Sequence, residues 1–222
     1  PRHELLPKNI SPRERGENRR VKVLVLAGSR SPTDPVAEVG GKSAKAFVEV
    51  GGIPMIERVI DTLRESGCCA TIQVSLPAHF SVQEESPRLF AWLRAGVVEA
   101  VEPESSPAQS VLQAFPDPSG PPILLVTTCD HPLLSSAMVR ELLDAFEESG
   151  ADAVAGIVNT NTIRARYPNI KRTAIRFRDG PMTGCNLFAF RGDAGASVVR
   201  YWTRLEGHRK KPLRMARSVG IV

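Results

Sequence analysis

The sequence VKVLVL occupies Val21–Leu26, and Ala27-Gly28 follows it directly. This run is mostly apolar and β-branched, which predicts a buried strand. A second run of this kind, ILLVT, occupies Ile123–Thr127. Shorter runs predict further strands at Ala70–Ser75, Val97–Val101, Ala153–Val158, Thr173–Phe177 and Asn186–Phe190, the last two separated by a turn at Asp179-Gly180.

Helical patterns separate these strands. Pro54 opens an amphipathic stretch that ends at Gly67, and Ser106-Pro107 is an N-cap and first-turn proline for a helix through Phe115. Ser135 or Ser136 caps a third helix, which Gly150 ends and whose apolar face we expect to hold Met138, Leu142, Leu143 and Phe146. Two more helices are expected at Leu89–Leu93 and Ala194–Leu205. Strands that alternate with helices predict βαβ units, and therefore an α/β fold with a largely parallel sheet covered on both faces.

The composition is that of a globular protein. The 222 residues are 42% hydrophobic and 24% charged, and no apolar run reaches the length of about 18 residues that a membrane span needs. Residues 1–20 are polar, contain Pro7 and Pro12 and show no hydrophobic period. We therefore expect a polar N-terminal arm over residues 1–20 and one domain over residues 21–222.

The cysteines indicate the redox compartment, and the distribution of charge indicates the kind of binding partner. The four cysteines form no C-x-x-C pair and have no histidine at zinc-ligand spacing, which is typical of proteins in a reducing cytoplasm. The net charge of +5 is uneven, because Arg164–Arg178 holds six basic residues and no acid, and Arg200–Arg217 holds seven basic residues and one acid. Such clusters favour anionic partners, although a solvated surface would also account for them.

Candidate site residues follow the predicted strands, because ligands of open α/β sheets bind beyond the carboxyl ends of the strands. The loop LAGSRSPTDP begins at Leu26, and its glycine would let backbone N–H groups approach a phosphate. The loop matches neither G-x-G-x-x-G nor a P-loop, so a plain turn remains the alternative. Lys45 comes after this loop and could neutralise phosphate oxygens, or it could be a surface lysine before a short strand.

Asp130 follows the strand Ile123–Thr127 in the sequence CDHP. A carboxylate in this place suits Mg²⁺, which binds through one or two carboxylates and substrate phosphates. The alternative, an N-cap, is weakened by the distance from Ser135, and the neighbouring His131 is expected to be structural or solvent-facing. Ser106 and Ser110, at the start of their helix, could contact an anion or hydroxyl groups, or could simply cap the helix.

Taken in order, these segments resemble the nucleotidyltransferase superfamily with the GT-A-type fold, and most closely its MobA-like NTP transferase family. The resemblance covers roughly residues 21–190. It is carried by Leu26-Ala27-Gly28, by the lysine segment Lys45–Ile56, by Cys129-Asp130-His131-Pro132, by Ser106–Leu112 and by Thr183–Phe188.

The resemblance implies a three-layer α/β/α sandwich with a mostly parallel mixed sheet, of the nucleotide-diphospho-sugar transferase type. It implies a Mg²⁺-dependent enzyme that transfers NMP from an NTP to a phosphorylated small molecule and releases pyrophosphate; nucleic acid is not the expected partner. The implied roles are catalytic for Lys45 and Arg30, nucleotide-binding for Leu26, Ala27, Gly28, Ser29, Ser106 and Ser110, acceptor-binding for Gly184 and Asn186, and metal-binding for Asp130. Charge and position add Lys171 and Arg172 to the acceptor-binding group.

Three departures from the family pattern leave alternatives open. Ser29 replaces the second glycine, Ser31–Ala44 is longer than usual, and the D-x-D-x-P-x-D segment with a second metal carboxylate is not present before Val222. One alternative is a glycosyltransferase on the same fold, but Cys129-Asp130-His131 lacks the D-x-D triplet of such enzymes. Another is a non-catalytic nucleotide- or nucleic-acid-binding module, for which two Trp and two Tyr provide few stacking platforms.

Overall fold

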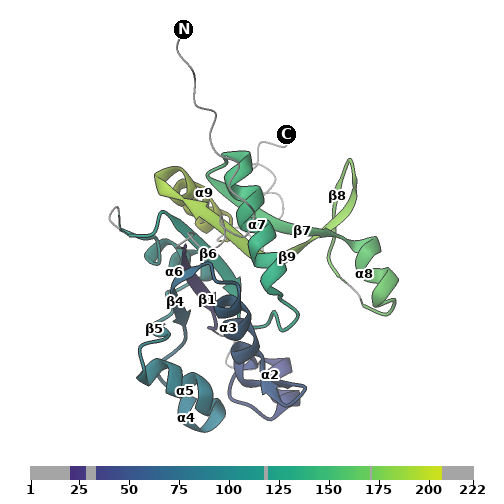
Figure 1. The fold of residues 1–222 in the computed structure, drawn as a ribbon. Coiled ribbons are helices and arrows are strands. Elements are labelled where there is room, and N and C mark those ends of the chain that lie inside the picture. The colour runs from purple at the N-terminus through teal and green to yellow at the C-terminus, as the bar shows by residue number, and fades with distance from the viewer. Residues whose placement is uncertain (1–20, 29–33, 118–119, 171, 207–222) are drawn as a thin grey trace.

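The structure is a computed structural model that describes residues 21–28, 34–117, 120–170 and 172–206. The expected arm over residues 1–20 and the basic residues after Glu206 lie outside this part of the chain. In the described part, strands and helices alternate as the sequence predicts (Figure 1). No helix there is both long and apolar enough to cross a membrane.

A mixed sheet forms the centre of the fold, in the order β5-β4-β1-β6-β9-β7. Its parallel half consists of β5 (Glu99–Val101), β4 (Cys69–Ser75), β1 (Val21–Leu26) and β6 (Ile123–Thr128). Among the described strands of this sheet, β9 (Gly180–Arg191) alone runs in the opposite direction, antiparallel to β6, β7 (Ala153–Asn159) and the short strand β8 (Ile175–Phe177). The described strands thus make a mostly parallel mixed sheet with β1 and β6 in the middle.

Two separate apolar cores lie on the two faces of the sheet. Val23 and Val25 of β1 face α3 (Met55–Glu65), α5 (Pro87–Arg94) and α7 (Ser136–Ser149), whereas Leu24 faces α6 (Pro107–Gln113) and α9 (Gly192–Glu206). Successive side chains of a strand point to opposite faces, so a continuous apolar run such as VKVLVL supplies both cores. The expected three-layer α/β/α sandwich is confirmed (Figure 1).

Most expected boundaries agree with the structure. Ser106 and Ser135 are the N-caps of α6 and α7, and Gly150 ends α7 with a left-handed φ of 63°. The apolar face of α7 is partly different from expectation, because Val139 is buried while Met138 is 47% exposed. Leu143 and Phe146 are buried as predicted.

The structure contains elements that the sequence did not indicate. β9 starts at Gly180 and has twelve residues, and α8 (Thr160–Arg166) follows β7 directly. Together, α8 and β8 form an arm that extends away from the body of the sheet (Figure 1). Between β1 and α3 lie α2 (Pro35–Gly40), the 3-10 turn η1 (Lys45–Phe47) and the hairpin of β2 (Glu49–Val50) and β3 (Ile53–Pro54), and a short helix α4 (Val82–Glu85) precedes α5.

The turn η1 is anchored by burial. Ala46 and Phe47 are completely buried, and the ring of Phe47 packs edge-on against Phe80 with 5.8 Å between the ring centroids. Lys45, directly before them, is only half-buried. The two apolar side chains therefore fix the backbone of Lys45 while its ammonium group stays accessible.

We predict that Phe47→Ala lowers the free energy of unfolding by about 3–5 kcal/mol, because it removes a completely buried ring and leaves a cavity. Urea unfolding measures this loss. The matched control is Val39→Ala on α2, whose side chain is 93% exposed and whose loss should cost less than about 0.5 kcal/mol. Equal losses for the two variants would contradict the anchoring role of Phe47.

Candidate functional site

The topology places a crevice at the carboxyl ends of β1 and β6. The chain leaves β1 toward β4 through α3 on one face, and it returns from β5 to β6 through α6 on the other face. Connections that diverge to opposite faces in this way open the crevice in which ligands of α/β proteins bind. Leu26 and Thr128 are neighbours across the two strand ends, and Cys129 N–H donates to the Leu26 carbonyl at 3.0 Å.

The turn after β6 is tied to α3. Thr62 Oγ1 donates to the Leu134 carbonyl at 3.2 Å, and Leu134 N–H donates to the His131 carbonyl at 3.0 Å. These bonds fix the backbone on the C-terminal side of Asp130, and the β1–β6 pairing fixes it on the other side. The Asp130 side chain is consequently held at the crevice.

Lys45 and Asp130 meet at this crevice. Lys45 Nζ donates to Asp130 Oδ2 at 2.7 Å, and the two side chains are 26% and 31% exposed. The residues are 85 positions apart in the sequence, so only the fold brings them together.

The pair shifts the pKa of both groups. Burial alone would lower the pKa of Lys45, but the hydrogen bond and the negative charge of Asp130 outweigh it, so the pKa lies above its ordinary value. Burial alone would raise the pKa of Asp130, but the hydrogen bond and charge of Lys45, with contributions from the Thr128 side chain and the backbone, outweigh it and lower the pKa. Lys45 thus stays an ammonium and Asp130 a carboxylate near neutral pH.

Part of the carboxylate remains available. Asp130 Oδ1 is buried and has no hydrogen-bond partner among the described residues, and the same is true of Thr128 Oγ1 and His131 Nδ1. A buried carboxylate oxygen without a partner is a suitable Mg²⁺ ligand when substrate phosphates and water supply the remaining positions. The described part of the chain holds no group of three or more His, Cys, Asp or Glu that could bind a metal.

His131 carries an unpaired nitrogen beside this carboxylate. Burial lowers its pKa, the charge of Asp130 acts in the opposite direction, and the charge of Arg172 lowers it further. The imidazole is therefore neutral near pH 7.

The loop after β1 is described only at its start. Ala27 is buried and donates its N–H to the Ser75 carbonyl at 2.9 Å. A Cβ at Gly28 would meet Pro103 at 3.5 Å, an ordinary contact, so the described backbone does not by itself demand glycine there. Ser29 and Arg30, the expected phosphate-loop and catalytic residues, lie outside the described residues.

Both serines of α6 have structural roles in this structure. Ser106 Oγ accepts the Gln109 N–H at 3.3 Å as the N-cap, and Ser110 Oγ accepts the Glu104 N–H at 2.9 Å from a 5% exposed position. Their hydroxyl hydrogens are not used by these two bonds. The alternative of simple capping is therefore realised for Ser106, and nothing in these contacts points to a nucleotide.

Asn186 lies at an irregularity of β9. It has a φ of 51°, and the β7–β9 register shifts between Ala155 and Ile157, which pair with Phe188 and Gly184. A bulge of this kind redirects side chains, and a non-glycine residue at positive φ often marks a functional site. Gly184 and Asn186 are both exposed, and a Cβ at Gly184 would meet nothing within 4 Å.

The basic residues proposed for the acceptor are only partly visible. Arg172 is exposed, and its charge contributes to lowering the pKa of His131 and counteracts the burial that raises the pKa of Cys185. Arg172 thus lies within electrostatic reach of the turn after β6 and of the β9 bulge. Lys171 lies outside the described residues.

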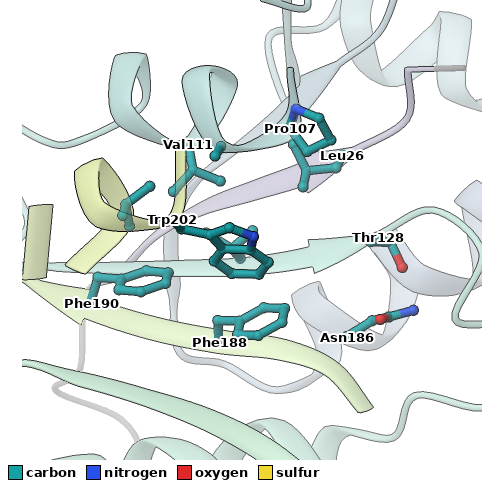
Figure 2. Close-up of a pocket in the computed structure, with 11 residues that line it drawn as sticks. Leu26, Pro107, Val111, Thr128, Asn186, Phe188, Phe190 and Trp202 are labelled. Atoms are coloured by element: carbon teal, nitrogen blue, oxygen red, sulfur yellow. The ribbon is translucent and has the colours of Figure 1, made fainter. Parts of the chain in front are cut away.

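A pocket of about 150 Å³ adjoins the crevice, on the sheet face covered by α6 and α9. Figure 2 shows Phe188, Phe190 and Trp202 around it, with Thr128 and Asn186 at one end. Leu26 and Asn186 were expected at a site, but the aromatic residues were not. The apolar periodicity of Ala194–Leu205 predicts that Trp202 lies in a helix. It does not show whether an apolar side chain of that helix lines a pocket or packs in the core.

Comparison with known proteins identifies the family. Residues 23–184 match the model of the MobA-like NTP transferase domain. The chain belongs to this family. The expected resemblance is thereby confirmed, and the chain is a nucleotidyltransferase.

Solved structures agree with this family and its fold. A protein described as a hypothetical transferase from Thermus thermophilus is 29% identical, with a TM-score of 0.69 over 89% of this chain and 77% of that one. The 4-diphosphocytidyl-2C-methyl-D-erythritol synthase of Anaerococcus prevotii is 14% identical, with a TM-score of 0.56 over 84% and 77% of the two chains. A CMP:2-keto-3-deoxy-manno-octonic acid synthetase in complex with CTP is 14% identical, with a TM-score of 0.55 over 91% and 87%.

The pKa of Asp130 provides a test of the ion pair. In the wild type, the carboxyl ¹³C signal of Asp130 should titrate below the ordinary value of 3.8. Lys45→Met removes the main group that opposes the effect of burial, so the same signal should titrate at a higher pH than in the wild type. Lys42→Met is the control, because Lys42 pairs with Glu49 and Glu85 instead, and it should leave the signal unchanged.

The lowered pKa of Asp130 also determines how this residue changes the stability of the fold with pH. Because the pKa of Asp130 is lowered in the folded state, Asp130 contributes to the free energy of unfolding at pH values above its ordinary pKa. This contribution is lost as the pH falls through the lowered pKa. An Asp130 signal that titrates at the same pH in the wild type and in Lys45→Met would contradict the pair.

Proposed function

We propose that this chain transfers a nucleoside monophosphate from an NTP to a phosphorylated small molecule, such as a sugar phosphate, a polyol phosphate or a cofactor precursor. An oxygen of the acceptor phosphate attacks the α-phosphorus, the bond from the α-phosphorus to the bridging oxygen breaks, and pyrophosphate leaves. The observation that supports this most is the contact of Lys45 with Asp130 at the crevice between β1 and β6.

Lys45 neutralises negative charge in this proposal. Phosphoryl chemistry depends on positioning and on stabilising the charge that develops on phosphate oxygens. Lys45 is positively charged, half-buried and held by the buried residues Ala46 and Phe47, so its ammonium group needs little rearrangement to reach a ligand in the crevice. Arg30 is proposed as the second cation, on the family resemblance alone.

Asp130 is the proposed metal ligand. Its Oδ1 has no partner among the described residues, which fits a Mg²⁺ held by one carboxylate and the substrate phosphates. When bound, Mg²⁺ would supply Lewis-acid stabilisation of phosphate oxygens. Lys45 keeps the carboxylate ionised and therefore ready to bind a cation.

The nucleotide is proposed to lie over the end of β1. Backbone groups of Gly28 and Ser29 would approach its phosphates, and Ala27 and Ser110 would contact the ribose or base. Leu26 belongs to the same proposed nucleotide-binding group. Ser106 and Ser110 are retained in this group because their hydroxyl hydrogens are not used by the bonds that position them. The base that is preferred is not assigned.

The acceptor is proposed to lie on the β9 side of the crevice. Asn186 and Gly184 are exposed there at the bulge, and Arg172 lies within electrostatic reach. Its positive charge, with that of Lys171, suits a phosphate ester. Nucleic acid is not the proposed acceptor.

The proposal treats residues 21–222 as the nucleotidyltransferase domain and residues 1–20 as a polar arm. It places the protein in the cytoplasm, which the four free cysteines support, because unpaired thiols persist in a reducing compartment.

Pyrophosphate release tests the proposed function. The full chain is mixed with each of the four NTPs, Mg²⁺ and a panel of sugar and polyol phosphates. We expect release with at least one combination, loss of release with EDTA, and a decrease of about 10²–10³-fold in kcat for Lys45→Ala. Lys42→Ala removes a lysine that pairs with Glu49 and Glu85 on the surface, and it should retain wild-type activity.

Two results would contradict the proposal. NTP binding without turnover on any acceptor would favour the non-catalytic alternative, and turnover that survives Lys45→Ala would remove the role of this residue.

A further inference from the structure

The pocket beside the crevice has the chemistry of a site for an apolar ring. Of the described residues that line it, Thr128 and Asn186 carry the side-chain oxygens, and the others are aliphatic or aromatic. Phe188 packs edge-on against Trp202 with 5.5 Å between centroids and lies stacked on Phe190 at 6.4 Å. A cavity of about 150 Å³ with such walls has room for one six-membered ring.

The pocket is exposed to solvent at Trp202 and is polar at the end that meets the candidate site. Trp202 is 41% exposed although it lines an apolar pocket, which leaves much of its surface without a described partner. At the other end Thr128 Oγ1 is buried without a hydrogen-bond partner in the described chain. Thr128 ends β6, at one end of the pocket (Figure 2), and precedes Asp130 by two residues of a turn. Two residues span at most about 7 Å, so a ligand in the pocket could reach the carboxylate.

The pocket lies between the end of β1, where Leu26 of the proposed nucleotide group lines it, and the β9 side of the crevice that is proposed for the acceptor. The proposed nucleotide residues Ser106 and Ser110 are one turn apart on α6 and do not line it, whereas Ala108 and Val111 do. Residues four apart share a helix face, so the serines and the pocket occupy different faces of α6. The opposite wall comes from β9, at the bulge that presents Asn186.

We propose that this pocket binds an apolar ring of the acceptor, so that the acceptor is a phosphate ester with an aromatic or alicyclic group instead of a bare polyol phosphate. The ring packs between Trp202, Phe188 and α6, and Thr128 and Asn186 bind polar atoms at the end of the pocket that meets the candidate site. The phosphate then points toward Asp130 and Lys45. This inference rests on the proposed function in one respect, because that function makes the bound molecule the acceptor. Binding of the ring itself does not require turnover.

Ligand-observed NMR with three probes tests the inference on the full chain without NTP. We expect phenyl phosphate to bind at least tenfold more tightly than inorganic phosphate or glycerol 3-phosphate, because it alone places an apolar ring in the pocket. Trp202→Ala removes the aromatic wall, and Ala108→Leu fills the cavity from α6. Each should weaken phenyl phosphate about tenfold and leave inorganic phosphate unchanged.

The matched control is Tyr201→Ala, since Tyr201 is the exposed neighbour of Trp202 on α9 and does not line the pocket. It should bind phenyl phosphate as the wild type does. Thermal unfolding shows whether each variant is folded. If Ala108→Leu does not fold, Trp202→Ala alone tests the inference.

A parallel titration with NTP separates this inference from the proposed function. If Trp202→Ala weakens NTP as much as phenyl phosphate, the pocket holds the nucleobase and the inference is overturned. It is also overturned if the wild type binds phenyl phosphate no better than inorganic phosphate. Failure of pyrophosphate release, with ring binding intact, would instead refute the proposed function alone.

Discussion

The contact between the Lys45 ammonium and the Asp130 carboxylate is the interaction on which the candidate site depends. It needs β1 beside β6, so that the turn after β6 lies at the crevice, and it needs η1 anchored by Phe47. Both requirements come from apolar packing in one core below the sheet ends. The polar site is therefore positioned by hydrophobic burial.

The contact between Lys45 and Asp130 is of a kind that a ligand can replace. Two half-buried opposite charges lose part of their hydration, and a pair of this kind contributes little net stability because that loss offsets the attraction. The exposed fraction of each side chain lets a ligand enter. A bound phosphate would offer Lys45 a second anionic partner, and a cation would offer Asp130 one, so the site can trade an internal ion pair for two contacts with a substrate. This explains why both groups stay charged and why Asp130 keeps one oxygen without a partner.

The sequence predicted what local patterns determine. VKVLVL gave the bounds of β1, and Ser106-Pro107 gave the start of α6, because burial and capping act within a few residues. β9 was underestimated because Gly180 and Pro181 are turn residues by propensity, and only pairing with β8 and β7 makes them part of a strand. Met138 was placed in the core although Val139 takes that place, since one residue of rotation in α7 is set by tertiary packing. Asp130 could be predicted because it follows a central strand, and Lys45 because its segment resembles the lysine segment of the family. The pocket around Trp202 could not, because it exists only once α6 and α9 pack together.

A double-mutant cycle on NTP affinity tests the central claim most directly. Calorimetric titration of the wild type, Lys45→Met, Asp130→Asn and the double variant with NTP and Mg²⁺ gives the coupling between the two side chains. We predict that each single variant binds at least tenfold more weakly and that the two effects are not additive, with a coupling of about 0.5–3 kcal/mol. Equal NTP affinity for all four proteins would show that the ligand does not use the crevice between β1 and β6.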